Sequence, residues 1–134
     1  MFYVQTNTAG QTAYLSLKEG ELILAATYTH YLVKLVHVNT GQEFFFIPTV
    51  LTENDRVTHL EFDTNVNDPL NGGILLVDPG RYTYNIYAQN SGTNLDPSLS
   101  LGLVEEGFME ANWGATYYQT PSFTTPSDYI YNGQ

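Results

Sequence analysis

Three polar side chains that alternate along one predicted strand are the first candidates for chemistry. His59, Glu61 and Asp63 stand two residues apart. Because successive side chains of a strand point to opposite faces, all three would lie on one face. A histidine with two carboxylates is a possible ligand set for a transition metal. Such a triplet is more often a solvated strand face, so we predict no metal site and no cofactor.

A second acidic run, residues 63–68, has the oxygen-ligand spacing that opens a calcium loop. It reads Asp-Thr-Asn-Val-Asn-Asp. An EF-hand loop needs glycine at its sixth position and glutamate at its twelfth, where this chain has Asp68 and Ile74. We therefore expect a solvated turn, with an adventitious or structural cation as the alternative.

Motifs of nucleophilic and phosphate chemistry are missing from the sequence. It contains no nucleophile elbow, phosphate-binding loop or dinucleotide fingerprint. Glu105 and Glu106 are adjacent, so in a strand they point to opposite faces and cannot form a close carboxylate pair. A small sandwich also rarely provides the deep cleft of a glycosidase. We predict that the protein is not an enzyme.

Charge and composition limit the partners. The chain has 134 residues and a net charge of −10, with 4 Lys and Arg against 14 Asp and Glu. Proteins that bind nucleic acid or anionic lipid need Lys and Arg to neutralise phosphates, so we expect neither partner. There is no cysteine, no apolar run of membrane-spanning length and no signal-peptide pattern at Met1–Val4. We expect a soluble protein made in a reducing cytoplasm.

The elements that must position these residues are short strands. Apolar and polar residues alternate with a period of two, and turn residues interrupt them every 8–12 positions. The nearest helix candidate, residues 17–26, is short. Strands are predicted at residues 2–6, 11–17, 29–38, 43–49, 56–63, 74–77, 81–89 and 101–112, with loops at 52–55, 64–73 and 90–100 and a break at Gly107. The pattern predicts an all-β domain over residues 1–112, a β-sandwich of seven or eight antiparallel strands.

The composition changes after Asn112. Residues 113–134 carry a single charge, Asp128, while Pro121 and Pro126 keep the backbone extended. The aromatic residues of this segment are Trp113, Tyr117, Tyr118, Phe123, Tyr129 and Tyr131. Aromatic side chains are typical interface anchors. We expect an extended C-terminal arm laid on a neighbouring subunit; an arm packed across its own domain and a disordered end are the alternatives.

The run from Asp78 to Tyr84 is similar to the Asp-x-Gly-x-Tyr-x-Cys element of immunoglobulin-like domains. In that element the tyrosine hydroxyl bonds to the backbone at the corner before strand F. Asp78, Gly80 and Tyr82 occupy the matching positions here, and Tyr84 replaces the cysteine. The resemblance implies an immunoglobulin-like fold and one structural hydrogen bond from Tyr82. No further part of the immunoglobulin pattern is present.

Several motifs, in order, resemble a family of small virion structural proteins of tailed phages from aquatic and gut bacteria. They are Tyr31-Leu32-Val33-Lys34, the hairpin Asn39 to Phe44, Asp68 to Gly72, the strand Pro79 to Tyr87, Asn94-Leu95-Asp96-Pro97, and Leu103 to Gly107. The match covers residues 11–111. The aromatic tail departs from the shorter members of the family.

The resemblance implies a non-enzymatic component of a virus particle. Its partners would be other virion proteins of the capsid or tail, in a homo-oligomer, and its location would be the virion. A capsid decoration or auxiliary protein is the preferred placement, and a tail, connector or fibre-anchor component is the first alternative. A carbohydrate-binding module is the second, with Tyr28, Tyr87, Tyr117 and Tyr118 as possible platforms.

Overall fold

The computed structural model describes residues 2–54 and 56–112, and over them the chain is all-β, as predicted. Its strands are β1 (Phe2–Gln5), β2 (Gln11–Leu15), β3 (His30–His37), β4 (Glu43–Phe46), β5 (Thr49–Glu53), β6 (Thr58–Phe62), β7 (Asn65–Asp68), β8 (Gly73–Leu75), β9 (Gly80–Gln89) and β10 (Gly102–Asn112). The helical elements are α1 (Gly20–Leu24) and the two 3-10 turns η1 (Pro69–Asn71) and η2 (Pro97–Leu99).

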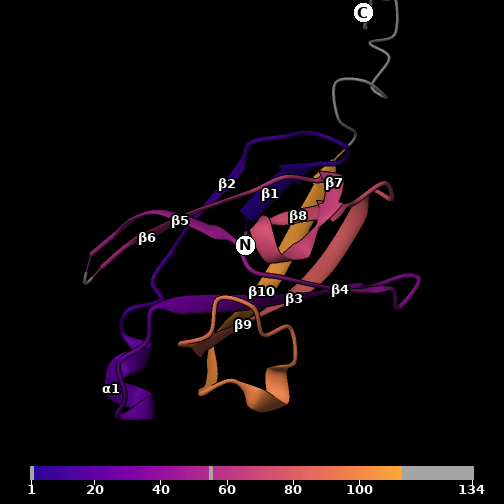
Figure 1. Cartoon of the computed structure of the whole chain (residues 1–134). Helices are drawn as coiled ribbons and strands as arrows, with labels where there is room; N and C mark the ends of the chain where they lie inside the picture. The colour runs from indigo at the N-terminus through magenta and orange to yellow at the C-terminus, as the bar shows by residue number, and fades with distance from the viewer. Residues whose placement is uncertain (1, 55, 113–134) are drawn as a thin grey trace, which may run out of the picture.

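The strands form two main sheets and a small hairpin. The five-stranded sheet has the order β1-β10-β9-β3-β4, and the three-stranded sheet has the order β2-β6-β5. The hairpin joins β7 to β8. In Figure 1 the three-stranded sheet lies above β3, β4 and β9, and the connection from β9 to β10 hangs below them. The two sheets thus form two layers with one space between them.

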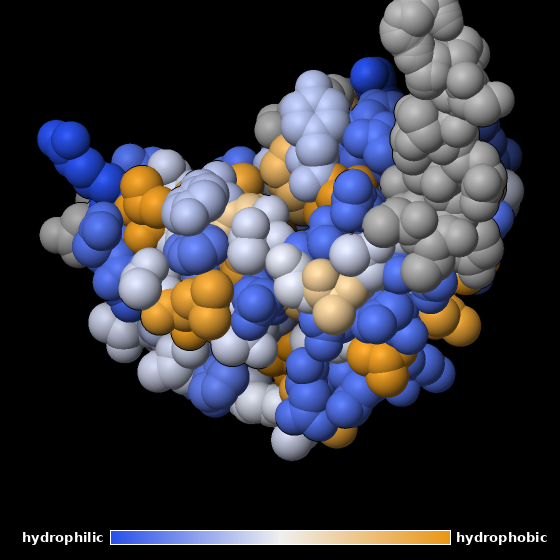
Figure 2. Space-filling model, turned by 90° about the horizontal axis from the view of Figure 1, so that it is seen from above, coloured by the Kyte–Doolittle hydropathy of each residue, from blue (hydrophilic) through white to orange (hydrophobic). Residues whose placement is uncertain are grey.

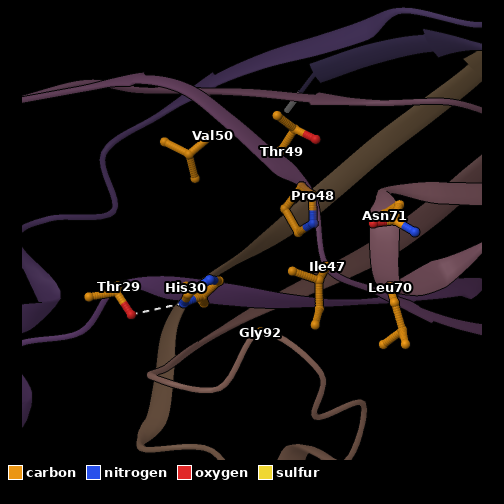
Figure 3. Close-up of a pocket in the computed structure, with 9 residues that line it drawn as sticks. All are labelled: Thr29, His30, Ile47, Pro48, Thr49, Val50, Leu70, Asn71 and Gly92. Carbon is orange, nitrogen blue, oxygen red and sulfur yellow. Dashed lines mark hydrogen bonds between the residues drawn. The ribbon is translucent and has the colours of Figure 1, made fainter.

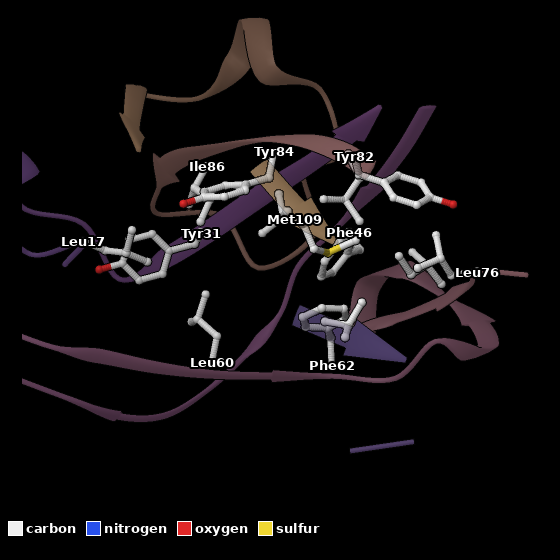
Figure 4. Close-up of a cluster of buried hydrophobic side chains, with 14 of the residues drawn as sticks. Leu17, Tyr31, Phe46, Leu60, Phe62, Leu76, Tyr82, Tyr84, Ile86 and Met109 are labelled. Atoms are coloured by element: carbon white, nitrogen blue, oxygen red, sulfur yellow. The ribbon is translucent and has the colours of Figure 1, made fainter. Parts of the chain in front are cut away.

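Aromatic and aliphatic side chains from both layers fill that space. Leu60 and Phe62 of β6 point toward residues of the five-stranded sheet in Figure 4. Phe62 lies against Phe46 of β4, with 5.0 Å between ring centroids. Tyr31 and Tyr84 are also buried in this cluster. In β6, β9 and the other strands that contribute to this cluster, the alternation of apolar residues therefore buries one face of the strand.

A polar contact also joins the two layers. The Tyr31 hydroxyl on β3 donates a hydrogen bond to the Glu53 carboxylate on β5. The Thr58 hydroxyl donates to the same carboxylate oxygen at 2.8 Å, and Lys18 Nζ lies 3.7 Å from the other oxygen. Burial and the bond to Glu53 raise the pKa of Tyr31 well above its usual value. This buried phenol therefore stays protonated and bridges the sheets.

Three differences from the sequence prediction concern strands. Ten strands are present in the described residues, because β7 lies in the stretch expected to be a loop at 64–73 and β5 extends into the one expected at 52–55, whereas β8 overlaps the strand predicted at 74–77. β1 and β10 run parallel, so the expectation of antiparallel strands throughout is wrong for that pair. β10 passes Gly107 unbroken, and its irregularity lies between Leu103 and Glu105.

The short helix α1 lies between β2 and β3, inside the helix candidate of residues 17–26, which is too short for the sequence to predict a helix. A Cβ on Gly20, the first residue of α1, would lie 2.4 Å from Val104 Cγ1 and 2.7 Å from the Tyr28 hydroxyl. Only glycine lets the chain approach β10 so closely. The helix ends at Ala25, whose φ of 54° is left-handed. The position of α1 is therefore determined by its packing against β10 and Tyr28, and not by a 3.6-residue repeat of apolar residues.

Candidate interaction surface

The outer face of the five-stranded sheet gathers exposed aromatic residues at the β1–β10 edge. The strand register places Tyr3 of β1, Glu110 of β10 and Arg81 of β9 in one row. Phe108 stands two residues from Glu110, on the same face and within diagonal reach of Tyr3. Tyr3 is 65% exposed and Phe108 is 45% exposed. Two large rings therefore face solvent side by side.

The cations of this face lie over its aromatic rings. Arg81 Cζ lies 5.1 Å from the Phe108 ring centroid, and its Nε is 3.5 Å from Glu110 Oε1. At the other edge, Lys34 Nζ lies 5.8 Å from the Phe45 centroid and 3.8 Å from Glu43 Oε2. Exposed pairs of this kind are weak, each contributing about 0.5–1 kcal/mol at most. The face combines aromatic side chains with both signs of charge, and aromatic residues and arginine are enriched in the surfaces that proteins bury against each other.

Three leucines extend the apolar surface beyond the end of the sheet. Leu99, Leu101 and Leu103 are 73%, 45% and 39% exposed, and they alternate from η2 into β10. The loop that carries them is held by side-chain bonds. Asn94 Nδ2 donates to Gln89 Oε1 at 2.8 Å. These leucines are thus presented to solvent by a braced loop.

A carboxylate caps η2 within that loop. The Ser98 backbone N–H and hydroxyl both donate to Asp96 Oδ1, at 3.0 and 2.8 Å. These bonds lower the pKa of the Asp96 carboxyl. Leu99, the most exposed leucine, follows directly after the capped residue, so the cap fixes the turn from which it projects.

The predicted corner residues lie at the turn into β9. The Tyr82 hydroxyl donates to the Asp78 carbonyl oxygen at 2.6 Å. Gly80 has a φ of 124°, in the region that favours glycine. His37, which the sequence did not single out, is buried beside them with its Nε2 3.1 Å from the Pro79 carbonyl oxygen. The alternation of residues in β3 predicts that His37 points inward. It does not predict that the Pro79 carbonyl oxygen is its partner.

The candidate metal triplet does not come together in the described residues. His59 and Glu61 stand on the outer face of β6, whereas Asp63 lies beyond that strand and accepts the Gly10 N–H at 2.8 Å. In the part of the chain that the structure describes, no three His, Asp or Glu side chains form a group that could hold a metal ion. His59 instead stacks on Tyr14, 4.1 Å between centroids and 13° between planes.

The backbone of the acidic run at residues 63–68 is paired with a neighbouring segment, so the run is not the expected turn. Residues Asn65–Asp68 form β7, and Asp68 pairs with Gly73 of β8. The Asp63 N–H donates to Gly72 O at 2.7 Å. Asp68 accepts the Asn71 amide at 3.2 Å. The expected turn is therefore a hairpin closed by η1.

The tyrosines proposed as sugar platforms occupy different environments. Tyr28 is buried, and its hydroxyl donates to the Leu17 carbonyl oxygen at 2.5 Å. Burial raises the pKa of Tyr28. A buried ring has no free face, so Tyr28 cannot stack on a sugar. Tyr87 is half-buried on the outer face of β9. Tyr117 and Tyr118 lie outside the described residues, as does the rest of the predicted arm, namely Trp113, Phe123, Tyr129 and Tyr131.

A hollow of about 330 Å³ lies at one end of the two layers. His30, Pro48 and Leu70 are among the residues that line it in Figure 3. The His30 ring is held by a 2.8 Å contact between its Nδ1 and the Thr29 hydroxyl. A Cβ on Gly92 would lie 3.3 Å from His30 Nε2. The ring is therefore packed against the chain at Gly92.

Comparison with protein-family models, with curated proteins and with solved structures finds no match to this chain. None of the helices in the described residues is long and apolar enough to cross a membrane.

Proposed function

We propose that this chain is a non-enzymatic structural protein of a tailed-phage particle, where it decorates the capsid shell through protein–protein contacts. The observation that carries the proposal is the exposed aromatic edge formed by Tyr3 and Phe108, with Arg81 over the Phe108 ring. Aromatic residues and arginine are enriched where proteins bind each other. The order of sequence motifs supports the placement on a phage particle.

The size of the sheet is suited to such a contact. Five strands spaced by about 4.8 Å and a central strand rising about 3.3 Å per residue give a face of about 600 Å². A standard interface buries about 800 Å² on each partner. Part of the face is covered by the chain itself, since Leu32, opposite Tyr87, is fully buried, so a contact of standard size must include the adjoining leucines. A protein with a net charge of −10 would also bind the packaged genome poorly.

The finer fold is part of the proposal. An immunoglobulin-like sandwich is supported by the strand order, with β2-β6-β5 in one layer and β10-β9-β3-β4 in the other. Those orders correspond to the B-E-D and G-F-C-C′ strands of a variable-type domain. The bond from Tyr82 to Asp78 at the start of β9 supports the same assignment. Small domains of this kind commonly act by binding other proteins.

Quantitative mass spectrometry of gradient-purified particles tests the placement. Copies close to the number of the major shell protein support decoration, whereas a handful of copies indicates the tail or connector. Absence from the particles contradicts the proposal.

A binding assay tests the surface. Phe108→Ser should weaken binding to particles that lack the protein, by about tenfold or more, as loss of an aromatic anchor does. Leu75→Ser is the matched control, since Leu75 is 48% exposed on β8 and Phe108 is 45% exposed on β10. Equal binding by both variants would contradict the role of this face.

A further inference from the structure

The three-stranded sheet ends in a strand with an open edge. Over the described residues β2 pairs with β6 alone, in an antiparallel register from Gln11 opposite Phe62 to Leu15 opposite Thr58. The backbone groups on its other side form no ladder with a described strand. A strand edge of this kind is a template for pairing with another segment of chain.

Tyr14 marks that edge with an exposed ring. It stands on the outer face of β2 and is 66% exposed. Its ring stacks on His59 of β6 at 4.1 Å, so His59 covers one ring face. The other ring face is turned away from β6, toward the open edge. His59 Nε2 is buried and has no hydrogen-bond partner in the described residues, so packing alone holds this stack.

Figure 2 views the molecule from above, over the side that carries the three-stranded sheet. Hydrophobic residues form separate orange patches there among hydrophilic ones. Thr12, Thr49 and Glu61 share one row of this face, and Tyr14, His59 and Thr52 share the next. A surface that alternates hydroxyl and aromatic groups is suited to pair with a strand of similar composition.

The described chain ends beside the beginning of β2. The Thr6 N–H donates to the carbonyl oxygen of Asn112 at 2.7 Å. The Gln5 N–H donates to Gln11 Oε1 at 2.8 Å. The segment that follows Asn112 therefore starts close to Gln11, the first residue of the open edge.

That segment contains a window with the composition of a strand. Residues 115–120 read Ala-Thr-Tyr-Tyr-Gln-Thr, without a charge. Threonine and tyrosine favour strands. Gly114 precedes the window, and Pro121, which cannot donate a ladder bond, follows it. The window is about as long as β2.

We propose that residues 115–120 of one copy add as a strand to the open edge of β2 in a second copy, with a tyrosine of the window on the free face of Tyr14. The inference rests on the proposed function, since it names the partner through which this structural protein assembles. Main-chain ladder bonds supply affinity in such strand addition, and side-chain contacts supply specificity.

The position of the chain end favours a second copy over self-pairing. A segment that starts beside Gln11 would run along its own β2 in the parallel direction. To pair antiparallel with its own β2, the window would have to begin at the far end of that strand, at Leu15. That end is about 14 Å from Gln11 at about 3.4 Å per residue, which is farther than Trp113 and Gly114 can span. A second copy can place the window antiparallel, which is the slightly more stable pairing.

Disulfide trapping tests this pairing, because the chain has no cysteine of its own. With Tyr117 or Tyr118 opposite Tyr14 in an antiparallel pair, the residue opposite Thr12 is Gln119 or Thr120, respectively. A full-length chain with Thr12→Cys is therefore mixed with an isotope-labelled full-length chain with Gln119→Cys, and separately with one carrying Thr120→Cys. Adjacent side chains of a strand point to opposite faces. One of the two mixtures should therefore give a mixed disulfide in about tenfold excess over the other.

Thr49→Cys is the matched control. Thr49 is an exposed threonine in the same row as Thr12, on β5 at the opposite edge of the sheet. It should give no mixed disulfide above background with Gln119→Cys or with Thr120→Cys. Equal trapping of Gln119→Cys and Thr120→Cys, or trapping to Thr49→Cys, would overturn the proposal. So would an internal disulfide, without mixed product, in one chain that carries both Thr12→Cys and Thr116→Cys, the pair that parallel self-pairing brings together.

The result is independent of the particle experiment. Presence on particles without trapping removes the strand addition and leaves the proposed function. Trapping with absence from particles leaves the self-association and removes the phage assignment. Circular dichroism of each variant ensures that a lost disulfide is not a lost fold.

Discussion

His37 and Tyr82, on neighbouring strands, bind consecutive carbonyl oxygens of one turn. Their ring centroids are 4.6 Å apart, edge to face. Tyr82 donates to Asp78 O at 2.6 Å. His37 Nδ1 accepts the Thr40 N–H at 3.2 Å, so its Nε2 carries the proton and donates to Pro79 O at 3.1 Å. The two side chains fix the direction in which the chain enters β9.

Removing the hydroxyl at this corner should destabilise the fold. Tyr82→Phe keeps the buried ring and leaves the Asp78 carbonyl without its donor. We expect the free energy of unfolding in urea to fall by about 1–2 kcal/mol. Tyr87→Phe is the control, because the Tyr87 hydroxyl has only a 3.5 Å contact with Asn85 Nδ2. If Tyr82→Phe and Tyr87→Phe lower the free energy of unfolding equally, the hydrogen bond from Tyr82 to Asp78 does not stabilise the fold more than the Tyr87 contact does.

A side chain at Gly80 should also be costly. Gly80 has a φ of 124°, and a Cβ there would lie 3.2 Å from His37 Nε2. Gly80→Ala should lower the free energy of unfolding by about 2–3 kcal/mol through backbone strain and displacement of the imidazole. Gly41→Ala is the reference for a glycine of positive φ without a close contact, since Gly41 has a φ of 75° with open space around it. A loss at Gly80 no larger than that at Gly41 would remove the contact with His37 from the explanation.

Local alternation made much of the fold predictable. The inward Leu60 and Phe62 and the outward His59 and Glu61 follow from a period of two, and β6 has that burial pattern. Pro48 cannot donate a ladder hydrogen bond, so it predicts that the preceding strand lies on an edge or ends there. β4 ends at Phe46 and pairs with β3 alone in the described residues. These features are decided by residues close in sequence, so the sequence contains their signal.

Elements that depend on distant residues gave no such signal. β5 is mostly exposed and polar, so no alternation distinguishes it from a loop. The placement of Tyr3 on the same face as Phe108 depends on β1 lying parallel to β10, in a register that puts Tyr3 opposite Glu110. The corner motif predicts the bond that Tyr82 makes, but the contribution of His37 depends on a contact 42 residues away. Long-range contacts therefore set the candidate surface.

Thr64 joins the first two strands to the rest of the fold, and its hydroxyl should be essential for stability. It is fully buried; its Oγ1 accepts the Thr8 N–H at 2.8 Å and donates to Gln5 O at 2.6 Å. Thr64→Val keeps the shape and leaves a buried donor and acceptor unsatisfied, so the free energy of unfolding should fall by about 2–3 kcal/mol. Thr83→Val, on the outer face of β9, should be within about 0.5 kcal/mol of the parent. A neutral Thr64→Val would contradict this role.

Buried tyrosines should make the fold sensitive to alkali. Burial raises the pKa of Tyr31 and of Tyr82, and burial with the nearby Glu105 carboxylate raises the pKa of Tyr84 to about 12. Unfolded tyrosine ionises near pH 10, so above about pH 10 the folded chain binds more protons than the unfolded chain. Stability that is fully present below about pH 10 is then lost as the pH rises.

Each of these phenols should lower the free energy of unfolding by about 1.4 kcal/mol per pH unit in that range. Urea unfolding from pH 8 to 11.5 measures the slope. In Tyr31→Phe the slope should be smaller by about that amount, because one titrating group is gone. Phe46→Leu is the control, since it weakens the buried core without removing a titrating group and should retain the parent slope. If Tyr31→Phe retains the parent slope as well, Tyr31 ionises in the folded chain and cannot be the protonated bridge between the two sheets.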